Sequence, residues 1–215
     1  MPQSHGTCPP STAPALREGL SAAKREQILQ GAMRVFTSEG FGGASMEQVA
    51  KHSGVSKGTL YNYFDSKQAL FAVLIELECD KLRGLVFSLD GVRAAPEAVL
   101  MQVGLAFMQS TLRPHEMAMA RTVLAESHKF PELGRAFESA GPELGALSLG
   151  RYLRGLADQG LLKIDDELLA AHQFIGLCDA GMSRRAHLQI EQPSEQQISA
   201  TVAAAVRLFL KGYAG

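Results

Sequence analysis

Apolar residues recur every three or four positions along most of the chain, which is the spacing of one face of an α-helix. The first such stripe follows Ser21 and consists of Ile28, Leu29, Ala32, Val35 and Phe36. Gly40 interrupts it, because a glycine just after the last apolar position is a helix stop signal. No stretch alternates apolar and polar residues as a half-buried strand would. The pattern therefore predicts an all-α fold of about nine helices.

Helix start signals place several of these helices. A serine or aspartate followed three positions on by glutamine is a capping box, in which each side chain bonds the other residue's backbone N–H. The chain contains three such pairs: Ser45–Gln48, Asp65–Gln68 and Ser194–Gln197. Ser56 is a further N-cap candidate. These signals predict helices over about 45–52, 56–63, 65–86 and 194–212.

Prolines and glycines divide the middle of the chain. Proline suits the first turn of a helix, where its missing N–H has no partner to lose. Three prolines stand at such positions: Pro96, Pro114 and Pro131. Gly141-Pro142 ends or kinks the third of these helices. Another helix is predicted over 144–157, and Asp165 is expected to cap one that runs to about Met182.

Two short predicted helices, 45–52 and 56–63, are joined by a tight turn that contains glycine, which is the spacing of a helix-turn-helix. The second helix presents polar and amphipathic side chains suited to a major groove, while Leu60 and Phe64 lie one turn apart and point inward. Gly58 leaves room for a phosphate near the helix start, where free N–H groups attract anions. This arrangement favours a DNA reader.

The same stretch contains a competing motif. Gly54-Val55-Ser56-Lys57-Gly58 matches G-x-S-x-G, the nucleophile elbow of serine hydrolases. That elbow requires a buried strand before the serine, whereas an amphipathic helix precedes it here. A serine hydrolase is therefore a less favoured alternative, and a helical interaction module without DNA binding is a third. We predict that the chain is not an enzyme.

Two segments of the chain carry a family pattern: Phe36-Thr-Ser-Glu-Gly40-Phe41, and the run from Ser45 to Leu70, SMEQVAKHSGVSKGTLYNYFDSKQAL. On these segments the chain from Lys24 to about Leu74 resembles the DNA-binding domain of the TetR/AcrR family of transcriptional regulators. The departures are mild, the clearest being Ser53 where alanine is common. The resemblance covers roughly a quarter of the chain.

The resemblance implies a homodimer in which each protomer places the second motif helix in the major groove of a near-palindromic double-stranded DNA operator. It also implies that a small hydrophobic or amphipathic ligand in the larger domain respaces the two DNA-binding domains and releases the DNA. The motif and the resemblance together nominate these DNA-binding residues: Ser45, Ser56, Lys57, Gly58, Thr59, Tyr61, Asn62, Tyr63 and Lys67. A repressor is favoured over an activator. The sequence leaves the operator, the effector and the regulated genes open.

We expect three parts: a flexible N-terminal arm (1–20), a helix-turn-helix domain (21–67) and a helical ligand-binding and dimerisation domain (68–215). Charge is unevenly divided among them. Six cations and four anions give 21–67 a charge of +2. Residues 1–20 sum to zero and the whole chain carries −1, so 68–215 carries −3. A weakly basic end on an acidic remainder fits a modest phosphate footprint.

The three cysteines, Cys8, Cys79 and Cys178, are too scattered for a disulfide framework or a zinc site. A reducing compartment is indicated, no metal or cofactor is predicted, and a redox role for Cys79 or Cys178 is left open. Neither a signal peptide nor a membrane-spanning apolar run is recognisable, so we expect a cytoplasmic protein.

Flexible methionines and aromatic side chains gather in the predicted larger domain, where they would suit a pocket that adapts to its ligand. The candidate pocket residues are Met101, Leu105, Met108, Met117, Arg121, Phe137, Tyr152, Phe174 and Cys178. Ordinary helical core is the alternative for each of them. The last two long helices, over 165–183 and 194–212, have broad apolar stripes, and we expect them to form a four-helix dimer interface with their copies.

Overall fold

The computed structural model describes residues 21–86 and 94–214, with the backbone alone over 78–86. The described residues form α1 (Ala22–Gly43), α2 (Met46–His52), α3 (Lys57–Tyr63), α4 (Lys67–Val86), α5 (Pro96–Thr111), α6 (Pro114–Glu126), α7 (Pro131–Ala140), α8 (Pro142–Asp158), α9 (Glu167–Asp179), α10 (Met182–His187) and α11 (Glu195–Gly212). Across these residues the only β-type pairing is an isolated bridge between Leu162 and Ala214. The all-α prediction is confirmed.

Most helix starts follow the predicted capping residues. Ser45 and Ser194 each form a complete capping box with the predicted glutamine, and Ser56 caps α3. Two predicted caps are wrong by one residue. The hydroxyl of Ser66, not the Asp65–Gln68 pair, accepts from an N–H of α4, and Asp166 rather than Asp165 caps α9. Where two capping residues are adjacent, either one can cap the helix, so the sequence places the helix start only to within one residue.

Left-handed backbone conformations interrupt the helical chain at two places. Gly40 has φ 68° inside α1, so the helix kinks there and adds a last turn up to Gly43. Ala180 and Gly181, with φ 43° and 81°, separate α9 from α10. The helix expected to run to Met182 therefore ends at Asp179, because two successive left-handed residues cannot continue a right-handed helix.

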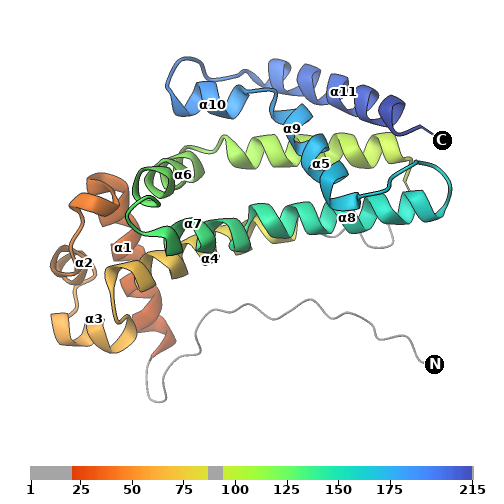
Figure 1. Cartoon of the computed structure of the whole chain (residues 1–215). Helices are drawn as coiled ribbons and strands as arrows, with labels where there is room; N and C mark the ends of the chain where they lie inside the picture. The colour runs from red at the N-terminus through yellow and green to blue at the C-terminus, as the bar shows by residue number, and fades with distance from the viewer. Residues whose placement is uncertain (1–20, 87–93, 215) are drawn as a thin grey trace, which may run out of the picture.

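The helices form two parts joined by α4. We call α1–α3 the head and α5–α11 the body. The head lies at one end of the molecule, and the C-terminal end of α11 lies at the other (Figure 1). In the body, α9 packs against α8 and α11, and α5 packs against α11. None of the described helices has both the length and the apolar composition needed to cross a membrane.

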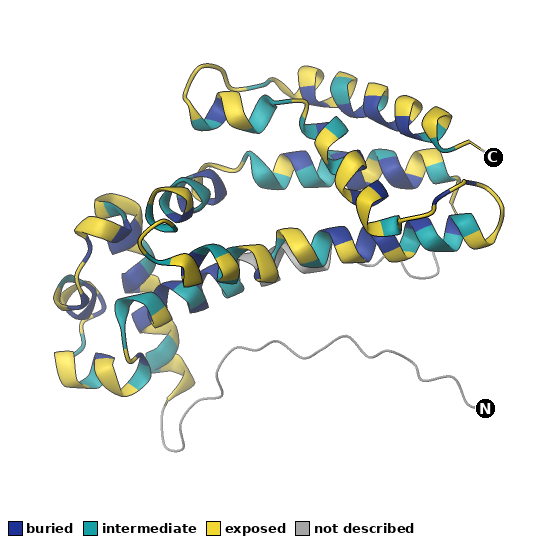
Figure 2. Cartoon of the chain, in the orientation of Figure 1, coloured by how far each residue is buried: buried dark blue, intermediate teal, exposed yellow. Residues whose placement is uncertain are grey.

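Two clusters of buried side chains lie along this axis. One joins the head to α4 and includes Met119 and Val123 of α6 and Leu133 of α7. The other lies among α5, α8, α9 and α11 and includes Phe174 and Phe209, whose rings meet edge to face. Buried and exposed residues alternate along most helices accordingly (Figure 2). The head thus shares its core with α4, α6 and α7, while the far end of the body has its own.

Candidate nucleic-acid interface

The turn between α2 and α3 is held against α1. Gly54 has φ 62°, a conformation that glycine adopts without strain. The buried hydroxyl of Ser53 donates to the carbonyl of Ile28 in α1. A Cβ added to Gly31 would lie 2.1 Å from Ser53 Oγ, so only glycine permits this close approach. The turn fixes the angle at which α3 leaves α2.

The α3 helix has one anchored face and one open face. Its start is capped by Ser56, whose hydroxyl accepts from the N–H of Thr59 at 3.0 Å. Leu60 is fully buried, and Phe64 just after the helix is buried as well. The open face carries Ser56, Lys57, Gly58, Tyr61 and Asn62, all exposed, with Thr59 half-buried beside them. The outer side of α3 is exposed at the tip of the head (Figure 2). This short helix can enter a groove without losing its packing.

Two of the predicted DNA-binding residues bond to residues at or beside the ends of α1. The Tyr63 hydroxyl accepts from the N–H of Ser21 at 2.9 Å and also reaches its carbonyl, which ties α3 to the start of α1. The Lys67 ammonium donates to the carbonyls of Phe41 and Ala44 at 2.6 and 2.9 Å and lies over the Phe41 ring. Burial lowers the pKa of Lys67, against an opposing effect of Glu126. Both residues fix the head's shape, and their contact with DNA stays a prediction.

Ser45 lies apart from the α3 face, at the start of α2, where it is exposed. Its hydroxyl and backbone N–H are both engaged with Gln48. The structure therefore gathers six of the nine predicted residues on one surface: Ser56, Lys57, Gly58, Thr59, Tyr61 and Asn62. We call this surface the α3 face.

The serine of the G-x-S-x-G match has no nucleophile geometry. Ser56 Oγ lies 2.8 Å from the Thr59 hydroxyl and caps α3. A helix, α2, precedes it instead of the buried strand that an elbow requires. Among the described residues, no group of three or more His, Cys, Asp and Glu side chains is placed to hold a metal ion.

Most of the predicted ligand-pocket residues lie in the two cores. Met101, Leu105, Met108, Tyr152, Phe174 and Cys178 belong to the far core of the body. Phe137 packs instead against the core shared with the head. Cys178 is fully buried, and burial and the nearby Asp179 raise the pKa of its thiol to about 12. Such a thiol is scarcely ionised at neutral pH and is unreactive. Cys79 lies outside the described side chains.

Two cavities lie elsewhere, and both touch α6. A cavity of about 400 Å³ separates the end of α1 from α6 and is lined by Met33, Glu39, Arg121 and Glu126 among others. A second cavity, of about 470 Å³, lies between the start of α6 and the segment after α10. Of the predicted pocket residues, Met117 lines the second and Arg121 lines both. The sequence pattern missed these cavities because their walls come from distant segments.

Known proteins resemble the chain over both parts. Residues 28–74 match the model of the bacterial regulatory proteins of the tetR family, and 98–215 match the C-terminal domain of AefR-like transcriptional repressors. A putative TetR-family regulator from Mesorhizobium loti superimposes with a TM-score of 0.82 at 26% identity, covering 92% of this chain and all of that one. The flavonoid-responsive regulator FrrA superimposes with a TM-score of 0.79 at 31% identity, covering 90% and 98%.

A sequence relative agrees with these structures. The HTH-type regulator YerO of Bacillus subtilis is 24% identical over 196 residues, which cover 76% of this chain and 67% of YerO. Two other curated regulators are matched over only about half of their length.

The helix-turn-helix head, the exposed α3 face and the helical body define a DNA-binding transcriptional regulator rather than an enzyme. The chain belongs to the TetR family of transcriptional regulators. Members of this family bind DNA operators and act as dimers.

Proposed function

We propose that this chain is a homodimeric repressor whose α3 face reads a near-palindromic operator and whose body binds a small effector that releases the DNA. The observation that carries the proposal is the division of α3, in which Leu60 is buried while Lys57, Tyr61 and Asn62 are exposed. The AefR-like repressor match supports repression. A regulator of chromosomal DNA acts in the cytoplasm, where we place it.

We assign DNA contacts first to Ser56, Lys57, Gly58, Thr59, Tyr61 and Asn62. Ser45, Tyr63 and Lys67 remain proposed contacts, with internal bonds that position the head as their second role. We keep 21–67 as the DNA-binding domain and 68–215 as the effector and dimerisation domain. The helix-turn-helix family match extends to residue 74, into α4, because the first turns of α4 pack in the head's core.

The dimer interface is proposed to lie on α9 and α11, within 165–183 and 194–212. These helices pack against each other and leave Leu168, Leu169 and Leu208 exposed. Exposed leucines that a second copy would cover suit a homodimer. Leu169→Glu with Leu208→Glu is expected to convert the dimer to a monomer in analytical ultracentrifugation. Leu124→Glu, on α6, changes a leucine that is at least as exposed and is the control.

The effector is proposed to be a small molecule, since FrrA, which shares the fold at 31% identity, is named as flavonoid-responsive. Its site is not assigned to Met108, Phe174 and Cys178, because these residues are packed in the core. The cavities beside α6 are the better candidates.

Selection of the purified chain against a randomised duplex library tests the DNA-reading proposal. We expect an inverted repeat with half-sites about one helical turn apart. On that operator, Lys57→Ala should weaken binding and reduce the salt slope by about one counterion. Lys211→Ala, an exposed lysine at the far end of α11, is the control for charge. Recovery of no enriched sequence would support the helical interaction module without DNA binding instead.

A further inference from the structure

The second cavity, between α6 and the segment 188–193, has the size and lining of a ligand site. Its volume of about 470 Å³ lies within the range of small-molecule pockets, about 300 to 1,000 Å³. Leu112, Pro114 and Met117 form the apolar wall on the α6 side. Ala186 of α10 and Ile190 form the opposite wall.

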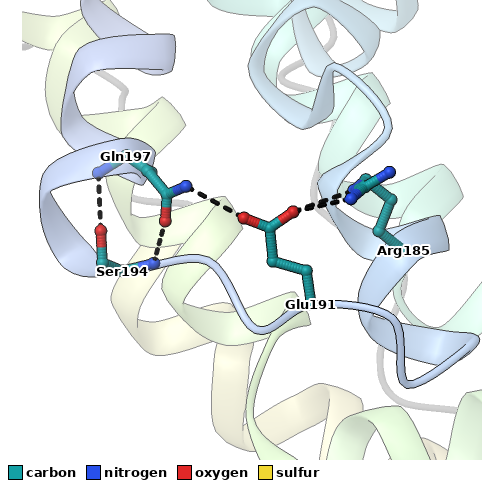
Figure 3. Close-up of polar contacts among 4 residues, drawn as sticks. All are labelled: Arg185, Glu191, Ser194 and Gln197. Atoms are coloured by element: carbon teal, nitrogen blue, oxygen red, sulfur yellow. Dashed lines mark hydrogen bonds and ion pairs between the residues drawn. The ribbon is translucent and has the colours of Figure 1, made fainter.

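The segment 188–193, which we call the strap, is held in place without a ligand. Both oxygens of Glu191 are bonded: one accepts from Arg185 Nε and Nη2 at 3.1 and 2.9 Å, and the other accepts from Gln197 Nε2 at 3.1 Å (Figure 3). Gln197 in turn completes the capping box of α11 with Ser194. The strap wall is therefore fixed from both α10 and α11, and a ligand would bind a preformed site.

The cation that lines this cavity is Arg121, and within the described part of the chain no carboxylate lies at ion-pair distance from its guanidinium. Glu191 also lines it, but its charge is neutralised by Arg185. The cavity at the end of α1 differs, since Glu39 and Glu126 face Arg121 there.

His187 lies close to both Arg121 and Asp179. Asp179 accepts backbone N–H bonds from Gly181 and Ser183 and so caps α10. Burial and the positive charge of Arg121 lower the pKa of His187, with Asp179 opposing. Anion binding by arginine gains both charge and paired hydrogen bonds.

We propose that this cavity binds a small amphipathic carboxylate, with its carboxylate on Arg121 and its apolar part between Met117 and Ile190. As an effector site, the proposal rests on the proposed ligand-responsive function. It also gives a route to the head: Arg121 lines the α1–α6 cavity as well, and α6 packs directly on α1. A ligand that draws Arg121 toward the strap acts on the helix that supports the head.

Calorimetric titration of the full chain with octanoate, octanol and octylamine tests the ligand class, because the three share one apolar tail. We expect octanoate to bind about tenfold tighter than octanol or more, as for a hydrogen bond to a charged group, and octylamine to bind weakest. Arg121→Gln should remove the preference for octanoate, and Arg121→Lys should keep part of it. Arg207→Gln, an exposed arginine on α11, should leave it unchanged. Equal binding of octanoate and octanol by the unaltered chain would overturn the proposal.

The position of the site can be read independently, because the chain contains no tryptophan. Leu188→Trp places one in the strap, and Leu161→Trp places one at a comparably exposed site in the α8–α9 loop. Octanoate should shift the emission of Leu188→Trp alone. A shift seen only in Leu161→Trp, or in neither variant, would mean that the ligand binds elsewhere and would overturn the site.

An experiment with DNA distinguishes this inference from the proposed function. Octanoate is added to the complex of the chain with its selected operator. If octanoate releases the operator from the unaltered chain but not from Arg121→Gln, the result supports both the carboxylate site and the proposed function. Octanoate binding at the strap without release leaves the carboxylate site standing and overturns its effector role. A chain that binds octanoate but selects no operator would refute the proposed function alone.

Discussion

The head exposes its candidate binding side chains, whereas the body buries most of the side chains that the sequence nominated for ligand binding. In the head, an exposed tyrosine, lysine and asparagine lie on a seven-residue helix whose anchor is a single fully buried leucine. In the body, Phe174, Met108 and Cys178 are buried side chains of the far core. The comparison teaches that binding groups in the head follow from local rules. In the body, the candidate binding groups line cavities whose walls come from segments distant in sequence.

The packing at two glycines makes the comparison quantitative. A Cβ at Gly31 would meet Ser53 of the head's turn at 2.1 Å. A Cβ at Gly104 would meet Val202 at 2.7 Å and Cys178 at 2.9 Å, where α5, α9 and α11 converge. The head and the body thus each contain a close helix contact that only a glycine permits, so both parts are tightly packed.

The largest effect is expected within α3. Leu60→Ala should lower the free energy of unfolding by about 3 kcal/mol, because it leaves a cavity at a fully buried position. Tyr61→Ala, at the next residue, should change it by less than about 0.5 kcal/mol, since this side chain is 41% exposed. Urea denaturation of both variants measures the difference. A large stability loss in Tyr61→Ala would place Tyr61 in the packing rather than in the DNA contact.

The two glycines give the next effect. Gly31→Ala and Gly104→Ala should each destabilise the chain by about 1 to 3 kcal/mol through overpacking. Gly155→Ala is the control, because no atom lies within 4 Å of its added Cβ. It lies inside α8, so alanine there should stabilise by about 0.5 to 1 kcal/mol. Thermal unfolding would contradict the packing if all three variants behaved alike.

The matching capping boxes allow a finer comparison. Ser45→Ala in the head and Ser194→Ala in the body remove equivalent hydroxyls, and each should cost about 1 kcal/mol. We expect only Ser45→Ala to weaken operator binding as well, because α2 sets the position of α3. Operator binding by fluorescence anisotropy, at a temperature where both variants are folded, separates the two effects. Equal loss of affinity would argue against a separate DNA-binding head.

The smallest effect concerns the strap. The bonds from Arg185 and Gln197 lower the pKa of Glu191 below its ordinary value of 4.5. The folded state thus favours the ionised carboxylate, and its stabilising contribution is present above pH 4.5 and is lost as pH falls through the lower folded value. Glu191→Gln should therefore differ from the unaltered chain at pH 7, and the difference should shrink as the pH falls below 4.5. Urea midpoints across this pH range test this, and a difference that grows toward low pH would contradict it.

How far the sequence predicts this molecule depends on the range of each interaction. Ser45, Ser56 and Ser194 could be recognised because a cap acts within three residues. The break at Ala180-Gly181 was missed, because alanine gives no warning of a left-handed conformation. The grouping of the pocket candidates has a similar limit: Met117 and Phe137 are both apolar and helical, but periodicity cannot say that they face different neighbours. The engagement of Lys67 by two carbonyls of α1 was also invisible, since 23 and 26 residues separate the partners.

The twenty residues of α4 have a mechanical consequence. At 1.5 Å per residue such a helix is about 30 Å long, and it is a single rod between the head and the body. A rotation of about 5° at its body end would sweep the other end through roughly 2.6 Å over that length. In a dimer the two rods would move oppositely, so the gap between the two α3 helices would change by about twice that distance. Against a repeat of about 34 Å in the duplex, this mismatch is large enough to matter for a helix seated in a groove.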